Sequence, residues 1–108
     1  MEKKILIPSN FTKHAWNTLV YALNLYKSVP CTFYILNAYK IPTRISLNRN
    51  QSAELEAAKA ESEKGLHKIM QGLNFRKENE KHTFETISRN KDLADAIQET
   101  VDTHKIDL

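Results

Sequence analysis

An N-terminal stretch indicates what this chain can fold into: Lys4-Ile5-Leu6-Ile7-Pro8-Ser9-Asn10-Phe11-Thr12-Lys13-His14-Ala15-Trp16. Its continuous apolar run, Ile5 to Ile7, is typical of a parallel strand that is covered on both faces. We therefore predict a strand over residues 3–8. Thr12 is a favourable N-cap residue, so a helix is expected to begin directly after it. In open α/β sheets, ligands bind at such junctions beyond the carboxyl ends of strands.

Two further elements follow this junction. Apolar residues recur at helical spacing after Thr12, and Val29-Pro30 ends the helix. The stripe consists of Ala15, Trp16, Leu19, Val20, Ala22, Leu23 and Tyr26. Residues 31–39 are again nearly continuous in apolar character, which predicts a second strand. A polar connection over about residues 40–51 is expected to be a mobile loop.

The second half of the chain repeats the alternation. Residues 52–74 keep one face apolar or small and predict a long helix. Residues 82–88 predict a third strand, whose polar content and charged flanks are typical of a sheet edge. Asp92 is expected to cap a third helix, and residues 105–108 look like the start of a fourth strand. Strands that alternate with helices predict an α/β sandwich of three layers, a parallel sheet with helices on both faces.

Composition excludes several classes of site. The 108 residues fit one small domain with a single modest core. The single cysteine, Cys31, rules out an intramolecular disulfide and a cysteine metal cluster, and it is expected to be buried. The two glycines, Gly65 and Gly72, both fall within a helical pattern. The sequence therefore contains no glycine-rich phosphate loop of the P-loop or dinucleotide type.

Charge and hydropathy limit the partners. The net charge is +3, but the basic residues are mixed with acids, as in residues 76–81, which favours a solvated surface over a nucleic-acid interface. No apolar run approaches the ~18 residues of a bilayer span, and the N-terminus does not read as a signal peptide. We expect a cytoplasmic protein with no nucleic-acid or membrane partner. The histidines have no short ligand spacing, so no metal site is predicted.

These segments, taken in order, resemble a universal stress protein (UspA) domain over essentially the whole chain. Residues 3–12 resemble the family's first strand and turn, residues 16–22 its first helix, and residues 33–39 its second strand. Residues 92–97 and 104–108 resemble the third helix and the entry to the fourth strand. The resemblance implies a Rossmann-like or flavodoxin-like parallel sheet with strand order 3-2-1-4-5, of which this chain would supply 3-2-1-4.

The resemblance also implies candidate binding residues. Many family members bind ATP or another adenine nucleotide, with the adenosine held by the turn after the first strand and by a position in the second. Carried over by position, the adenosine-side candidates are Pro8, Ser9, Asn10 and Ala38. Asn10 stands where ATP-binding relatives usually carry Asp, and an amide supplies no negative charge. The alternative role of Ser9 and Asn10 is local hydrogen bonding within the turn.

Parts of the family pattern are missing from this sequence. The family's glycine-rich phosphate loop, fourth helix and fifth strand would follow Leu108. We therefore expect residues 1–108 to be a single, C-terminally truncated domain, for example the first of a tandem pair. An incomplete fourth strand would expose an edge of strand 3–8, and exposed edges invite pairing, so self-association as a homo-oligomer such as a dimer is expected.

The expected function follows from the resemblance and from the missing parts. We expect a stress-response module with a partial adenine-nucleotide site, which acts by binding and association rather than as an enzyme. No cofactor is expected for residues 1–108, whereas ATP is a candidate for a full-length parent. One alternative is an ATP-binding, slowly hydrolysing universal stress protein when full length. Another is an enzyme of a different adenine-nucleotide α/β class.

Overall fold

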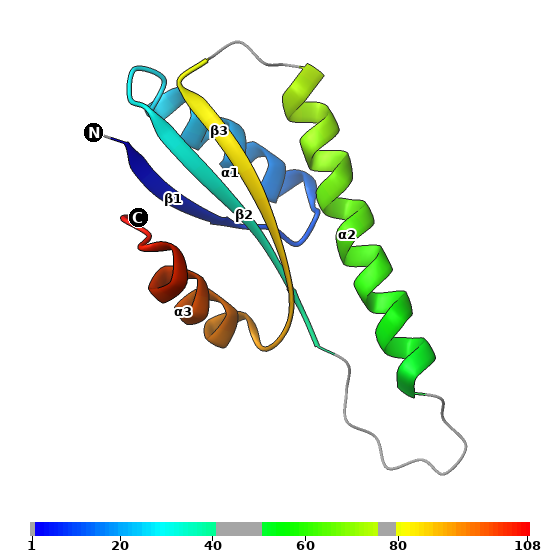
Figure 1. The fold of residues 1–108 in the computed structure, drawn as a ribbon. Helices are drawn as coiled ribbons and strands as arrows, with labels where there is room; N and C mark the ends of the chain where they lie inside the picture. Colours follow the sequence, from blue (N-terminus) through cyan, green and yellow to red (C-terminus); the bar gives the residue numbers. More distant parts are fainter. Residues whose placement is uncertain (1, 41–50, 76–79) are drawn as a thin grey trace.

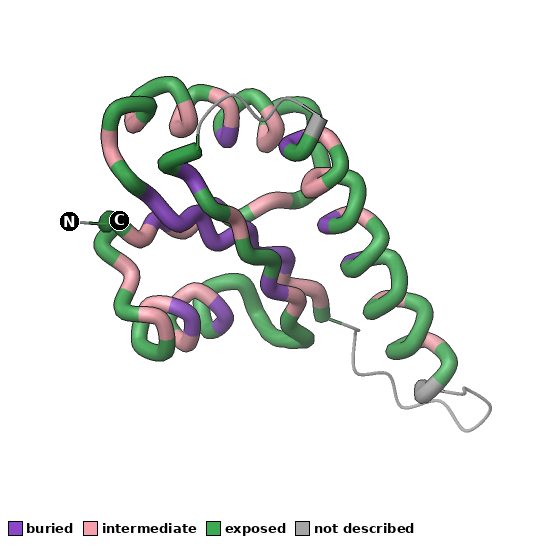
Figure 2. The backbone as a smooth tube through the Cα atoms, turned by 45° about the horizontal axis from the view of Figure 1, so that its top comes forward, coloured by how far each residue is buried: buried purple, intermediate pink, exposed green. Residues whose placement is uncertain are grey.

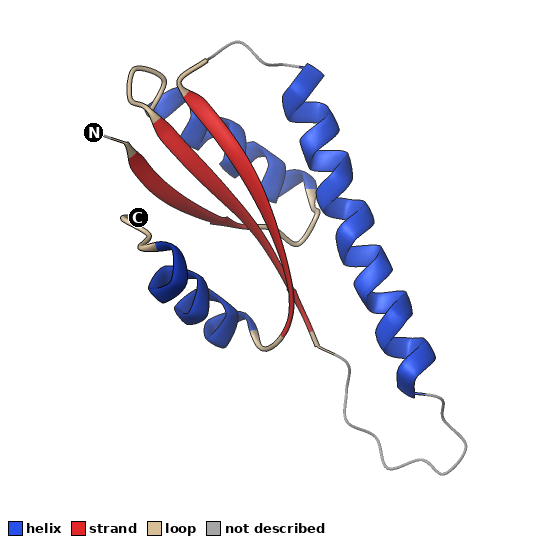
Figure 3. Cartoon of the chain, in the orientation of Figure 1, coloured by secondary structure: helices blue, strands red, loops and turns tan. Residues whose placement is uncertain are grey.

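The computed structural model describes residues 2–40, 51–75 and 80–108, and within them three strands alternate with three helices (Figure 1, Figure 3). The strands are β1 (Lys3–Pro8), β2 (Cys31–Tyr39) and β3 (His82–Asn90). The helices are α1 (Lys13–Leu25), α2 (Gln51–Phe75) and α3 (Leu93–His104). All six elements were predicted, although β3 continues to Asn90, beyond its predicted end at Ser88. The connection predicted over residues 40–51 lies, apart from its ends, outside the described residues.

The three strands form a parallel sheet in the order β1-β2-β3, with β2 in the centre. The register aligns Lys3 with Cys31, and Cys31 with His82, so the strands start together and their carboxyl ends meet at one edge. β3 lies at the side of the described sheet, as its polar sequence predicted. The arrangement confirms the predicted α/β class and agrees with the 3-2-1 part of the expected strand order.

Residues 107 and 108 lie beside β1, on the side away from β2. The backbone N–H of Asp107 donates to the Lys4 carbonyl at 2.8 Å, and the N–H of Leu6 donates to the Leu108 carbonyl at 3.0 Å. These two residues approach the sheet where a fourth strand was expected, but they form no strand in the described structure. Their bonds occupy β1 at Lys4 and Leu6, along the edge through which self-association was predicted.

Alternation along the strands divides the core into two clusters, because successive side chains point to opposite faces. One cluster packs beneath α1 and α2 and consists of Ile5, Ile7, Leu19, Cys31, Phe33, Ile35, Leu66 and Leu73. The other packs beneath α3 and consists of Tyr34, Leu36, Ile87 and Ala96. Figure 2 shows this buried sheet running between helices on either side. Right-handed crossovers explain the split, since α1 and α2 step the chain one way across the sheet and α3 leads it back.

The starts of α1 and α3 differ in how they are capped. Thr12 caps α1 as predicted, and its Oγ1 accepts a hydrogen bond from the Ala15 N–H at 3.1 Å. Asp92 occupies the N-cap position of α3 but makes no side-chain cap bond. Its carboxylate instead pairs with Lys40 at 3.1 Å. Asp92 thus occupies the predicted N-cap position, and its carboxylate bonds to Lys40 rather than to the helix backbone.

The amino-terminal half of α2 extends past the sheet (Figure 1). It is mostly exposed, and even Leu55 on its predicted apolar face remains open to solvent. The other half packs on the sheet through Leu66 and Leu73, which are buried. Within the described ranges, no helix combines the length and apolar character needed to cross a membrane.

Cys31 opens β2 and is fully buried, as the sequence predicted. Burial raises the pKa of its thiol above the ordinary value, and the nearby Lys3 ammonium only partly opposes this effect. A buried thiol with a raised pKa is chemically quiet at neutral pH, so Cys31 contributes packing to the fold.

We predict that shortening the side chain of Leu19 destabilises the core beneath α1. Leu19 is 2% exposed, so Leu19→Ala is expected to lower the free energy of unfolding by about 2–4 kcal/mol through lost burial and a residual cavity. Leu25→Ala on the same helix is the matched control, since Leu25 is 60% exposed and its loss is expected to cost less than about 0.5 kcal/mol. Urea denaturation measures both, and equal losses would contradict the described orientation of α1.

We also predict that Glu99 of α3 makes a pH-dependent contribution to the stability of the fold. Two hydrogen bonds lower the pKa of Glu99 below its ordinary value, and the bond from Lys91 has a larger effect than the bond from Arg89. A lowered folded-state pKa stabilises the fold above the unfolded pKa of about 4.3, and this stability is lost as the pH falls through the folded pKa. Glu99→Gln should therefore flatten the stability profile below about pH 5, measured by urea titrations. The exposed Glu56→Gln serves as control, and equal flattening there would argue against this contribution.

Candidate functional site

The turn between β1 and α1 is held by its own polar side chains. Ser9 Oγ accepts a hydrogen bond from the Phe11 N–H at 3.1 Å. Asn10 Oδ1 accepts from the Thr12 N–H at 3.2 Å and from the Thr12 hydroxyl at 2.6 Å. These are the local bonds that the sequence offered as the alternative role of Ser9 and Asn10. The Asn10 oxygen therefore takes part in starting α1.

Phe11 joins this turn to α2. Its φ of 66° is left-handed, which costs a residue with a Cβ roughly 1–2 kcal/mol. Its ring lies against Gly65, where an added Cβ would come within 2.6 Å of the ring atoms. Glycine in a helix interior is itself about 1 kcal/mol less favourable than alanine. Phe11 in the turn and Gly65 in α2 are thus both conformationally unfavourable, and they lie in contact with each other.

The four residues carried over from the family resemblance do not converge on one point. Pro8 ends β1 and is exposed, and the register aligns it with Leu36 of β2. Ala38, two residues further along β2, packs with the cluster beneath α3. By strand alternation Pro8 belongs to that same face, whereas Ser9 lines a cavity on the other face. Their role in adenosine binding stays a prediction.

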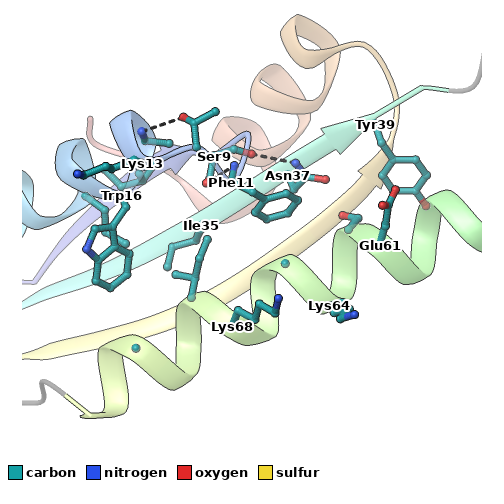
Figure 4. Close-up of a pocket in the computed structure, with 18 of the residues that line it drawn as sticks. Ser9, Phe11, Lys13, Trp16, Ile35, Asn37, Tyr39, Glu61, Lys64 and Lys68 are labelled. Carbon is teal, nitrogen blue, oxygen red and sulfur yellow. Dashed lines mark hydrogen bonds between the residues drawn. The ribbon is translucent and has the colours of Figure 1, made fainter.

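That cavity measures about 840 Å³ and opens between α1 and α2 at the carboxyl end of the sheet (Figure 4). Its volume is within the usual range of small-molecule sites. The sheet supplies a floor that includes Ile7, Ile35 and Asn37. The sequence pointed to this strand–turn–helix junction as a ligand site, but it did not show that α2 would form the opposite wall. A signal for that wall was the pair of glycines within the α2 pattern, since both reduce the bulk of the helix face that meets α1.

Asn37 is a residue of the cavity floor that sequence reasoning passed over. It is only 8% exposed, and its Nδ2 donates to the Ser9 carbonyl at 2.9 Å, as Figure 4 shows. Asn37 therefore ties β2 to the turn that follows β1. The available signal was an amide within the otherwise apolar run of residues 33–39, because a buried polar group requires a hydrogen-bond partner.

Comparison with known proteins places this geometry in context. The model of the "Universal stress protein family" matches residues 1–108, while no match is found among the curated proteins. The universal stress protein UspA from Lactobacillus plantarum is 18% identical with a TM-score of 0.76, over 97% of this chain and 72% of that one. A structure from the universal stress protein family of Burkholderia pseudomallei is 13% identical with a TM-score of 0.74, over 96% and 76% of the chains. At these identities the two structures show a shared fold.

The contact between Phe11 and Gly65 leads to a prediction for a double-mutant cycle. In the Phe11→Ala background, Gly65→Ala should stabilise the protein by about 1 kcal/mol, the usual gain of alanine in a helix. With Phe11 present, the new Cβ would displace the ring and most of this gain should disappear. Thermal and urea unfolding of the four proteins measures the coupling. The same stabilisation in both backgrounds would contradict the contact.

Proposed function

Because the chain belongs to the universal stress protein family over residues 1–108, we propose that it acts by binding and association rather than by catalysis. Family membership makes it a stress-response module. The proposal adds a cytoplasmic location and a partial adenine-nucleotide site beyond the carboxyl ends of β1 and β2. The site would hold the adenosine part of the ligand, with Pro8, Ser9, Asn10 and Ala38 as its candidate residues.

One observation carries this proposal: the β1–α1 turn is built at the carboxyl edge of a parallel sheet. Ligands of open α/β sheets bind in this region. α1 begins at the same point, and helix N-termini present N–H groups and a positive dipole end to a ligand. Pro8 and Ala38 offer small apolar surfaces against which a flat base can rest.

The residues present fit the adenosine part of a nucleotide better than its phosphates. Asn10 can exchange hydrogen bonds with a base or ribose but brings no charge. Both glycines of the chain lie inside α2, where the backbone N–H groups are committed to the helix and are not arranged as a phosphate-binding loop. We therefore propose weak, adenosine-directed binding. Association with a second copy along β1 would require Asp107 and Leu108 to leave the Lys4 and Leu6 backbone groups.

Titration calorimetry tests the nucleotide proposal. ATP and adenosine are expected to bind residues 1–108 with similar dissociation constants, on the order of 1 mM, because the triphosphate gains few partners. Micromolar ATP affinity together with slow phosphate release would overturn the proposal and favour the ATP-hydrolysing alternative.

A matched pair of variants tests the role of Asn10. Asn10→Asp keeps the oxygen that caps the turn and supplies the carboxylate typical of ATP-binding relatives. It is expected to tighten adenosine binding about three- to tenfold, the effect of one charge-assisted hydrogen bond. Asn17→Asp makes the same charge change on the exposed surface of α1 and should leave adenosine affinity unchanged. Equal affinity for adenosine in both variants would count against Asn10 as an adenosine contact.

A further inference from the structure

We propose that the cavity between α1 and α2 is a second ligand site, one that takes a small amphipathic anion. The ligand would have an apolar aromatic body and a single carboxylate or sulfonate group. This site lies on the face of the sheet opposite Pro8 and Ala38, so it is distinct from the proposed adenosine site, although Ser9 borders both. Its chemistry follows from three features of the cavity wall.

The first feature is a pair of aromatic rings that bridge from the α1 side to α2. The outer edge of the Phe11 ring meets Gly65, and the outer edge of the Trp16 indole meets Gly72, where added Cβ atoms would lie 2.6 and 3.1 Å from them. Seven residues of helix separate the glycines by about 10.5 Å. The two rings therefore meet α2 about two helical turns apart, and both line the cavity. Figure 4 shows the two rings on either side of Ile35.

The second feature is the apolar surface between these rings. Ile7, Leu19 and Ile35 lie beneath the cavity and are buried, so the accessible apolar surface comes from the two rings and from Ile69 of α2. This surface offers dispersion contacts to a flat apolar body. Polar residues also line the cavity, namely Ser9, Thr12, Asn37, Tyr39 and Ser62. The combination suits a ligand with an aromatic body and a polar end.

The third feature is positive charge at the rim. Lys64 and Lys68 both line the cavity and are exposed, and Figure 4 places them along α2 beside it. They stand four residues apart on one helix face, where like charges repel. Lys13 adds a third ammonium group to the lining, and Glu61 is the acidic residue among the described lining residues. The anionic group of a ligand at the rim would relieve this repulsion while the ligand's apolar body packs against Phe11 and Trp16.

The chain contains a built-in reporter for this site. Trp16 is its single tryptophan and lines the cavity. The probe is 1-anilinonaphthalene-8-sulfonate, which accepts excitation energy from tryptophan, and its uncharged counterpart is N-phenyl-1-naphthylamine. Energy transfer from Trp16 to both probes is expected on the folded protein, with tighter binding of the sulfonate.

Two double variants separate the rim charge from the overall charge. Lys64→Gln with Lys68→Gln should weaken sulfonate binding about tenfold, since two exposed ion pairs are lost, and should change binding of the neutral probe less than about twofold. Lys59→Gln with Lys105→Gln removes the same net charge from exposed positions outside the cavity lining. It should affect neither probe.

Several results would overturn the inference. They are the absence of energy transfer from Trp16, equal weakening of both probes, or equal weakening by both double variants. Displacement of the probe by laurate in preference to 2-naphthoate would overturn the aromatic part. Displacement of the probe by adenosine would show that the cavity and the nucleotide site are the same site, and it would overturn the proposal of a second site. A failed adenosine titration leaves all these readouts intact, so the two proposals fail independently.

Discussion

The double burial of β2 is the constraint on which the rest of this structure depends. From Cys31 to Asn37 every residue of the strand is buried, so both faces of the sheet must be covered. A parallel sheet meets this requirement through its crossover helices. Because the crossovers are right-handed, two successive steps in one direction place α1 and α2 on the same face, and the return step places α3 on the other. The two core clusters are the direct result.

The same alternation organises the carboxyl edge, where ligands of such sheets bind. Neighbouring residues of one strand belong to different sites: Asn37 reaches the Ser9 carbonyl on the α1–α2 side, and Ala38 packs beneath α3. Residues adjacent in sequence are therefore separated by the thickness of the sheet. Candidate residues taken from one short motif therefore lie on both faces of the sheet. For this reason Ser9 and Pro8, although adjacent in sequence, belong to opposite faces.

Local patterns were sufficient to predict the elements, and long-range contacts were needed to place the site. The continuous apolar runs of residues 3–8 and 31–39 and the Thr12 cap are properties of the sequence alone, and each predicted its element. Asp92 bonds instead to Lys40, a residue distant along the chain, so a local rule missed its partner. The cavity depends on which helix face meets Phe11 and Trp16. That pairing requires the whole β-α-β arrangement, and the glycines could not show it without knowledge of what they face.

Phe11 connects the β1–α1 turn to α2. Its backbone lies in the turn whose bonds to Ser9 and Asn10 start α1, while its ring rests on Gly65 as a wall of the cavity. The left-handed φ persists because the surrounding contacts determine it, and strain of this kind gathers where ligands bind. A ligand that moved the ring off α2 would remove a contact that helps to hold the strained φ, and the turn would then be less constrained at Asn10. The strained residue thus makes the turn, rather than the rigid sheet beneath it, the element that connects the contact with α2 to the start of α1.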